Sequence, residues 1–117
     1  MIDIKQKQAD YLRSLENSLV NVTHRLRSMP EVIRVILFGS YADGRRDLFT
    51  DLDILVIMDT EKSYLQRTAD LYQALQVDVD MDLFVYTPLE IKQMRDRSFI
   101  RQALKNGKVL YEKKPSG

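Results

Sequence analysis

The hydrophobic positions of the first part of the chain repeat with the period of an α-helix. Between Asp3 and Met29, apolar residues recur at alternating spacings of three and four, at Leu12, Leu15, Leu19, Val22, Leu26 and Met29. This spacing places them on one stripe of a long amphipathic helix that ends at Pro30. The repeat lasts under three heptads, so packing on a sheet is favoured over a coiled-coil seam. The single histidine, His24, lies off the stripe, and we expect it to be solvated.

Continuous apolar runs further along the chain predict β-strands. Val32–Phe38 is rich in β-branched residues and stops at a glycine, and Leu52–Met58 is a second apolar run. Val79–Tyr86 is a third, and Val109–Tyr111 predicts a short edge strand. Short apolar runs bounded by turn residues are typical of buried strands.

A helix is expected between the second and third strands. Asp59 and Thr60 are candidate caps for a helix from about Glu61 to Gln76. Its predicted inner face consists of the apolar residues Leu65, Ala69, Tyr72 and Leu75.

Two further helices follow the third strand. Thr87-Pro88 opens the first, because proline is tolerated at an initial helical position. A second runs from about Ser98 to Asn106 and ends at Gly107.

The segment from Tyr41 to Thr50, with a glycine and several charges, is expected to be a loop or a short helix.

Helices alternating with three to four strands predict an α/β fold, with helices packed against a mixed β-sheet. With 117 residues, the chain is long enough for one domain, which we place at residues 1–112. Residues 113–117 are expected to form a disordered tail. A content of 44% hydrophobic and 30% charged residues suits a folded chain rather than a disordered one.

Charge and composition narrow the possible functions. Eighteen basic against seventeen acidic residues give a net charge of +1, which does not support binding to a nucleic-acid backbone. Without cysteine, and with one histidine, the chain has no thiolate zinc site or imidazole cluster, so any metal must be held by oxygen. The N-terminus is charged and no apolar run approaches the length of a membrane span. These features predict a cytoplasmic protein.

Asp51 and Asp53 form a candidate metal site at the start of the second strand. Because side chains alternate along a strand, the two carboxylates project to the same side, about 6 to 7 Å apart. Buried beside apolar neighbours they would repel each other, and a divalent cation removes that cost. Magnesium commonly takes one or two carboxylates together with substrate phosphates.

A second metal ion needs a further carboxylate from a neighbouring strand. The third strand supplies Asp78, Asp80 and Asp82, all of one parity. Asp82 is preferred because it directly precedes an apolar run, as Asp53 does, and Asp80 is the alternative. Two Mg²⁺ ions about 3.5 to 4 Å apart would suit in-line phosphoryl displacement.

Gly39 and Ser40 stand where the first strand ends, which is where α/β sheets usually form ligand crevices. Glycine lets the backbone approach a phosphate, and the serine hydroxyl can donate to a phosphate oxygen. Arg45 and Arg46, in the following loop, are candidate donors to outer phosphate oxygens, although loop arginines are more often only solvated.

Either signal alone is weak, because Gly-Ser is an ordinary turn and Asp-x-Asp also occurs at strand ends. Their order on successive strands is more specific. The three segments Gly39–Gly44, Asp51–Val56 and Asp82–Pro88 resemble the minimal nucleotidyltransferases of the DNA polymerase β superfamily. The resemblance spans about half the chain, from Val35 to Glu90. Many members carry an arginine at the position of Tyr41 or Asp43, which this sequence lacks.

This resemblance implies a nucleotidyltransferase-like sheet and roles for individual residues. Ser40 would contact the triphosphate, Asp51 and Asp53 would bind both metal ions, and Asp82 would complete the catalytic one and help to activate the acceptor hydroxyl. Proteins of this type are often antitoxins paired with a HEPN ribonuclease toxin. The implied reaction is Mg²⁺-dependent transfer of AMP from ATP to a tyrosine of the toxin, in a site that the partner completes.

Two alternatives remain open at this stage. One is a non-catalytic antitoxin that neutralises a HEPN partner by occlusion. The other is nucleotidyl transfer to a small molecule such as an aminoglycoside. The acceptor, the base preference, the number of nucleotides added and any homo-oligomer are not fixed by the sequence.

Overall fold

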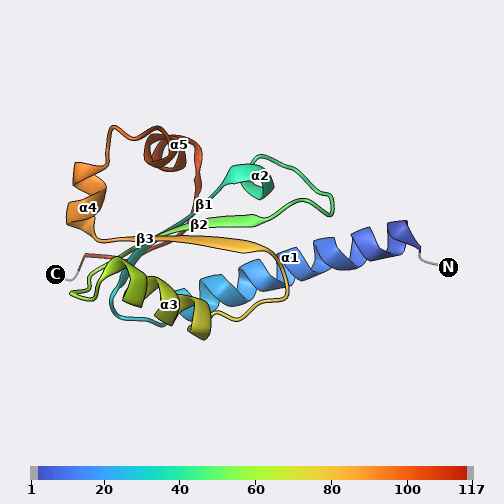
Figure 1. Ribbon diagram of the computed structural model, residues 1–117, viewed down its shortest axis with the longest axis horizontal. Helices are drawn as coiled ribbons and strands as arrows, with labels where there is room; N and C mark the ends of the chain where they lie inside the picture. The colour runs from blue at the N-terminus through green and yellow to red at the C-terminus, as the bar shows by residue number, and fades with distance from the viewer. Residues whose placement is uncertain (1–2, 116–117) are drawn as a thin grey trace.

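The computed structural model describes residues 3–115 of the chain. Four strands form one sheet in the order β3-β2-β1-β4, in which β1 is antiparallel to β2 and β4, and β2 is parallel to β3 (Figure 1). This mixed sheet with helices packed against it confirms the predicted α/β class. In chain order the elements are α1 Ile4–Arg27, β1 Val32–Phe38, α2 Gly39–Ala42, β2 Leu52–Met58, α3 Tyr64–Ala74, β3 Met81–Tyr86, α4 Pro88–Gln93, α5 Ser98–Asn106 and β4 Lys108–Glu112.

Helices cover both faces of the sheet (Figure 1). On one face α1 and α3 bury the larger core, in which Leu15 and Leu71 meet Ile54 of β2. On the other face α5 packs Ile100 against Leu55, with α4 at its side. Because neighbouring residues of β2 face opposite sides, both of its faces must be apolar, and this explains why its sequence is a continuous apolar run.

The amphipathic stripe of α1 is confirmed. Leu15, Val22 and Leu26 are fully buried, and Asp3 caps the helix by accepting a hydrogen bond from the Gln6 N–H at 3.2 Å. The helix ends at Arg27, just before Pro30. Its N-terminal half continues beyond the sheet, which gives the molecule an elongated shape of 55 × 29 × 28 Å (Figure 1).

The predicted inner face of α3 is confirmed only at Leu75, which is buried at the end of the helix, and is wrong at its other positions. Leu65 is 80% exposed and Tyr72 is also exposed, whereas the buried residues of the helix are Arg67 and Leu71. The helix begins at Tyr64 with Ser63 as its cap, later than the predicted start with caps at residues 59 and 60. A buried arginine carries no hydrophobic signal, so the apolar period pointed to a face rotated away from the true one.

The other elements lie close to their predicted ranges. β1, β2 and α5 match, and β3 begins at Met81, two residues later than expected. Thr87 caps α4, with its side chain and that of Glu90 each accepting from the other's backbone N–H. Strand β4 pairs with β1 at one edge of the sheet.

The assignment of residues 1–112 to one domain stays a prediction. Of the expected tail, residues 116–117 lie outside the described residues. Lys113 is still attached to the sheet, because its N–H donates to the Ile33 carbonyl at 2.8 Å. None of the helices in the described part of the chain combines the length and apolar character needed to span a bilayer.

An ion pair between a buried arginine and a half-buried glutamate joins α3 to α4. Arg67 is only 6% exposed and donates through two guanidinium nitrogens to the two carboxylate oxygens of Glu90. It also donates to the carbonyls of Lys62 and Val85. The pairing with Arg67 lowers the pKa of the Glu90 carboxyl from its ordinary value. Such a pair is costly to break from one side, because the remaining charge is left buried.

We therefore expect Glu90→Gln to lower the free energy of unfolding by about 3 kcal/mol, since Arg67 loses its counter-charge. The matched control is Asp70→Asn, which removes the exposed Lys62–Asp70 pair and should cost less than about 1 kcal/mol. Chemical denaturation of both variants measures the difference. Equal losses would show that the Arg67–Glu90 pair stabilises no more than a surface pair.

Candidate active site

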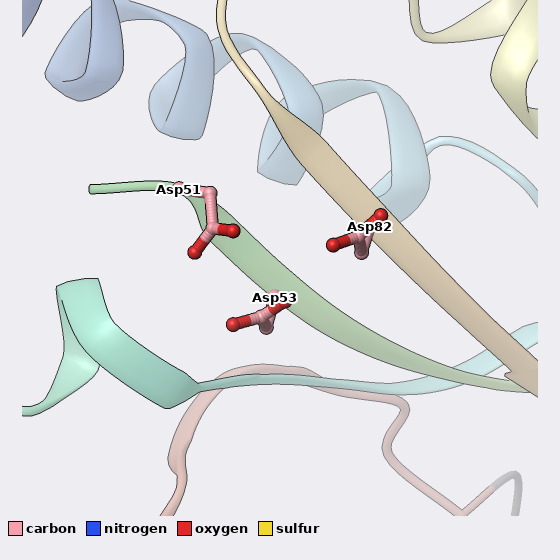
Figure 2. Close-up of side chains that lie close together, drawn as sticks. All are labelled: Asp51, Asp53 and Asp82. Carbon is pink, nitrogen blue, oxygen red and sulfur yellow. The ribbon is translucent and has the colours of Figure 1, made fainter. Parts of the chain in front are cut away.

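Three carboxylates meet where β2 and β3 begin. Asp53 is level with Asp82 in the parallel register, and Asp51 directly precedes β2 (Figure 2). One oxygen from each of the three carboxylates lies within 4.8 Å of the others. Strand alternation places Asp53 and Asp82 on the side of Leu55 and Phe84, which is the face covered by α4 and α5. The structure thus brings together the three acidic residues singled out in the sequence.

The cluster is electrostatically strained. Burial, and then the negative charges of Asp51 and Asp82, raise the pKa of Asp53 to about 6. Among the ion pairs formed by the described residues, none involves these three aspartates. Their mutual repulsion is therefore not relieved by a basic side chain.

The donor set fits a hard divalent cation. It consists of carboxylate oxygens only, and the ligand atoms are close enough to bind a common ion. Asp51 and Asp53 are half-buried and Asp82 is exposed, so the cluster is open to a substrate. Mg²⁺ favours such sites, with its remaining positions taken by water or phosphate.

Gly39 and Ser40 lie beside the cluster. The chain turns sharply at Gly39, which has a φ of 78°, and the short helix α2 begins there rather than after Tyr41. The Ser40 hydroxyl donates to Asp51 Oδ1 at 3.0 Å and accepts from the Asp51 N–H at 3.4 Å. The Gly-Ser turn and the first aspartate are therefore one hydrogen-bonded unit.

Asp53 occupies the space that a side chain at position 39 would need. A Cβ built on Gly39 would lie 2.1 Å from Asp53 Oδ2. Glycine is thus required at this position for two reasons, the positive φ and the close approach of the carboxylate.

The two loop arginines have partners of their own. Arg45 forms an ion pair with Asp47 at 2.9 Å. Arg46 donates to the carbonyl of Tyr41 at 2.8 Å and stacks over the Tyr41 ring at 3.6 Å. Both are exposed. A role for either in phosphate binding stays a prediction.

The neighbouring acidic residues of the third strand lie outside the cluster. Asp78 and Asp80 are exposed and precede β3, which begins at Met81. Asp80 contributes to the sheet through its backbone, because its carbonyl accepts from the Leu52 N–H at 2.9 Å. The geometry favours Asp82 over Asp80 as the third carboxylate.

A pocket that the sequence did not predict adjoins Gly39. Besides Gly39, its lining includes Phe38, Asp43 and three residues of α5: Phe99, Gln102 and Asn106. The rings of Phe38, Phe84 and Phe99 form a continuous aromatic cluster with centroids 5.5 and 5.7 Å apart. The residues of α5 that face this pocket follow a helical spacing of three and four, which is the only signal that the sequence offered.

The chain belongs to the polymerase β nucleotidyltransferase family, whose family model matches residues 20–116. The match includes the Gly-Ser turn and all three aspartates, so the class of the protein is that of a nucleotidyltransferase. No curated protein matches the chain in sequence.

Solved structures with a similar fold include toxin–antitoxin complexes. A mutant form of the toxin–antitoxin named MntA-HpeT has a chain that is 25% identical, with a TM-score of 0.53, over 85% of this chain and 73% of that one. A toxin–antitoxin with AMP-PNP has a chain that is also 25% identical, with a TM-score of 0.50 and coverages of 85% and 74%. A nucleotidyltransferase from Sulfolobus solfataricus shares the fold, with 20% identity, a TM-score of 0.54 and coverages of 94% and 87%.

We expect Gly39→Ala to disrupt the carboxylate cluster while leaving the sheet folded. The new Cβ would push Asp53 aside and strain a backbone of positive φ, at a cost of about 1 to 2 kcal/mol. Gly44→Ala is the control, since Gly44 also has a positive φ but nothing lies near its Cβ position. The increase in unfolding temperature produced by Mg²⁺ should be lost in Gly39→Ala and kept in Gly44→Ala.

The raised pKa of Asp53 predicts that the metal-free protein loses stability as the pH rises. Between its unfolded value of 3.8 and about 6, the folded protein binds the proton more tightly than the unfolded chain. The stability that this carboxyl contributes in its protonated form is fully present below pH 3.8 and is lost as the pH rises through about 6. Asp53→Asn should stabilise the metal-free protein at pH 7.5 by roughly 1 kcal/mol, after allowance for solvent screening. Thermal unfolding with EDTA and with Mg²⁺ tests this; a variant less stable than wild type in EDTA contradicts it.

Proposed function

We propose that this protein is a Mg²⁺-dependent nucleotidyltransferase that transfers AMP from ATP to a hydroxyl, and that the acceptor is a tyrosine of a HEPN-family toxin, for which it acts as antitoxin. The observation that carries the proposal is the convergence of Asp51, Asp53 and Asp82 on one open face, where no ion pair to a basic side chain is formed within residues 3–115. The position of the acidic cluster beside the turn at Gly39 and Ser40 supports the same function.

The reaction is a displacement at phosphorus. The acceptor oxygen attacks the α-phosphorus of ATP, a new P–O bond forms, and the bond from the α-phosphorus to the oxygen bridging to the β-phosphate breaks. Pyrophosphate leaves, and the hydroxyl proton passes to a carboxylate. Two bound Mg²⁺ ions would neutralise the triphosphate and make the acceptor oxygen more nucleophilic.

Each residue has a role that suits its place. Asp51 and Asp53 are half-buried and would hold both ions, whereas Asp82 is exposed and would complete the catalytic ion's site and help to activate the incoming hydroxyl. Ser40 would exchange its bond to Asp51 for one to a phosphate oxygen. Glycine at position 39 keeps the turn open to the triphosphate.

The partner is proposed from the comparisons as well as from the site. Two similar structures at 25% identity are toxin–antitoxin complexes, and one of them contains AMP-PNP, an analogue of ATP. We place the protein in the cytoplasm, where ATP and a ribonuclease toxin meet.

The test is transfer of label. The protein is incubated with α-labelled ATP, Mg²⁺ and a candidate HEPN partner, and labelled toxin is measured. Asp51→Asn combined with Asp53→Asn should reduce transfer by at least roughly a hundredfold, because the metal ligands are lost. The matched control is Asp59→Asn, an exposed aspartate at the opposite end of β2, which should transfer at the wild-type rate.

Absent transfer, or transfer unchanged in the double variant, contradicts the proposal. Measuring whether the double variant still suppresses toxicity in cells then tests the non-catalytic alternative. If the double variant still protects against the toxin, the protein neutralises its partner by occlusion. Label found on an aminoglycoside instead of the toxin would identify a small-molecule transferase.

A further inference from the structure

We propose that two tyrosine hydroxyls, those of Tyr11 and Tyr72, position the metal-binding carboxylates from the opposite face of the sheet. Tyr11 holds the backbone that leads into Asp51, and Tyr72 holds the backbone on both sides of Asp82. The inference rests on the proposed function, since it assigns these hydroxyls a part in building the same metal site.

Tyr11 reaches the site from α1. Its hydroxyl donates to the carbonyl of Thr50 at 2.7 Å, and Thr50 is fully buried. That carbonyl belongs to the peptide joining Thr50 to Asp51. One turn earlier on the helix, the Gln8 side chain donates to the Arg46 carbonyl at 3.2 Å. The part of α1 that continues beyond the sheet is therefore attached to the loop that carries Asp51.

The same peptide is also held from its other side. Its N–H, which belongs to Asp51, donates to the Ser40 hydroxyl at 3.4 Å. The hydroxyl of Thr50 accepts from the Asp47 N–H at 2.9 Å, so the residue before Asp51 cannot rotate freely. With both of its polar groups bonded, the peptide plane is fixed, and with it the direction in which the Asp51 side chain leaves the backbone.

Tyr72 performs the matching task on β3. This strand lies at the edge of the sheet, so alternate backbone groups have no strand partner. The Tyr72 hydroxyl accepts from the Leu83 N–H at 2.8 Å and donates to the Met81 carbonyl at 3.3 Å. These two residues flank Asp82. The hydroxyl thus takes the place of a neighbouring strand at the one residue of β3 that joins the carboxylate cluster.

Neither tyrosine can be a catalytic residue. The helices α1 and α3 cover the face opposite to the carboxylates, and the hydrogen bonds of both hydroxyls go to backbone groups. Tyr72 is 39% exposed. Replacement by phenylalanine removes the hydrogen bonds and keeps the ring, which isolates the positioning effect.

The test measures binding of Mn²⁺ alone, by electron paramagnetic resonance of the free ion. Tyr11→Phe and Tyr72→Phe should each weaken Mn²⁺ binding by about tenfold, as expected when groups that orient metal ligands are removed. Tyr111→Phe is the control, since β4 lies at the far edge of the sheet from β3, and it should bind Mn²⁺ like the wild type. A purely structural role would lower the unfolding temperature without changing the affinity of the folded protein.

A Mn²⁺ affinity within twofold of the control in either folded phenylalanine variant would overturn the inference for that tyrosine. Because Tyr72 is exposed, its variant tests the idea even if Tyr11→Phe fails to fold. The outcome is independent of AMP transfer. If the wild type binds Mn²⁺, the two variants bind it more weakly and no toxin is labelled, the proposed function fails and the inference stands. A wild type that binds no Mn²⁺ overturns both.

Discussion

The parallel pairing of β2 with β3 is the constraint on which the site depends. It sets Asp53 level with Asp82 on one face of the sheet, while Asp51 joins them from the residue before the strand. Strands that carry continuous apolar runs cannot slip by one residue without turning these carboxylates into the core. The hydrophobic core therefore imposes a repulsion among like charges that the chain alone does not relieve, and a divalent cation is the natural counter-charge.

The acidic cluster is held in place by the Gly-Ser turn and by helices α1 and α3. Gly39 leaves room for the Asp53 carboxylate, and Ser40 binds the side chain of Asp51. From the opposite face, helices α1 and α3 reach the backbone beside the outer two aspartates. A site of this kind needs its ligands held within fractions of an ångström, and rigid elements achieve this better than loops do. In this fold of the polymerase β family, the glycine turn, the starts of β2 and β3, and the two helices all lie next to the acidic cluster.

The strands and the acidic cluster could be predicted from the sequence, because both depend on local patterns. Apolar runs gave the bounds of β1 and β2, and Asp53 and Asp82 stood at equivalent places before apolar runs. The inner face of α3 could not be predicted, since it contains Arg67, whose burial depends on Glu90 in another helix. Features that depend on contacts between distant segments do not show in the local pattern of apolar and polar residues.

The same limit applies to the supports of the site. Tyr11 and Thr50 are 39 residues apart, and nothing local in either segment indicates that they touch. The α5 pocket residues were missed for a similar reason, because they share a helix with buried apolar residues whose stronger period dominates. Only the three-dimensional arrangement shows which polar groups serve the acidic cluster.

The elongated shape of α1 has a consequence for local motion. Its later turns are covered by the sheet, and Tyr11 packs against the core, while in the turns before it Gln8 donates a single hydrogen bond to the Arg46 carbonyl. Opening of those first turns needs much less free energy than global unfolding, since few contacts hold them. An opening that extended to Tyr11 would also free the Thr50 carbonyl beside Asp51, which would couple motion at the start of α1 to the acidic cluster.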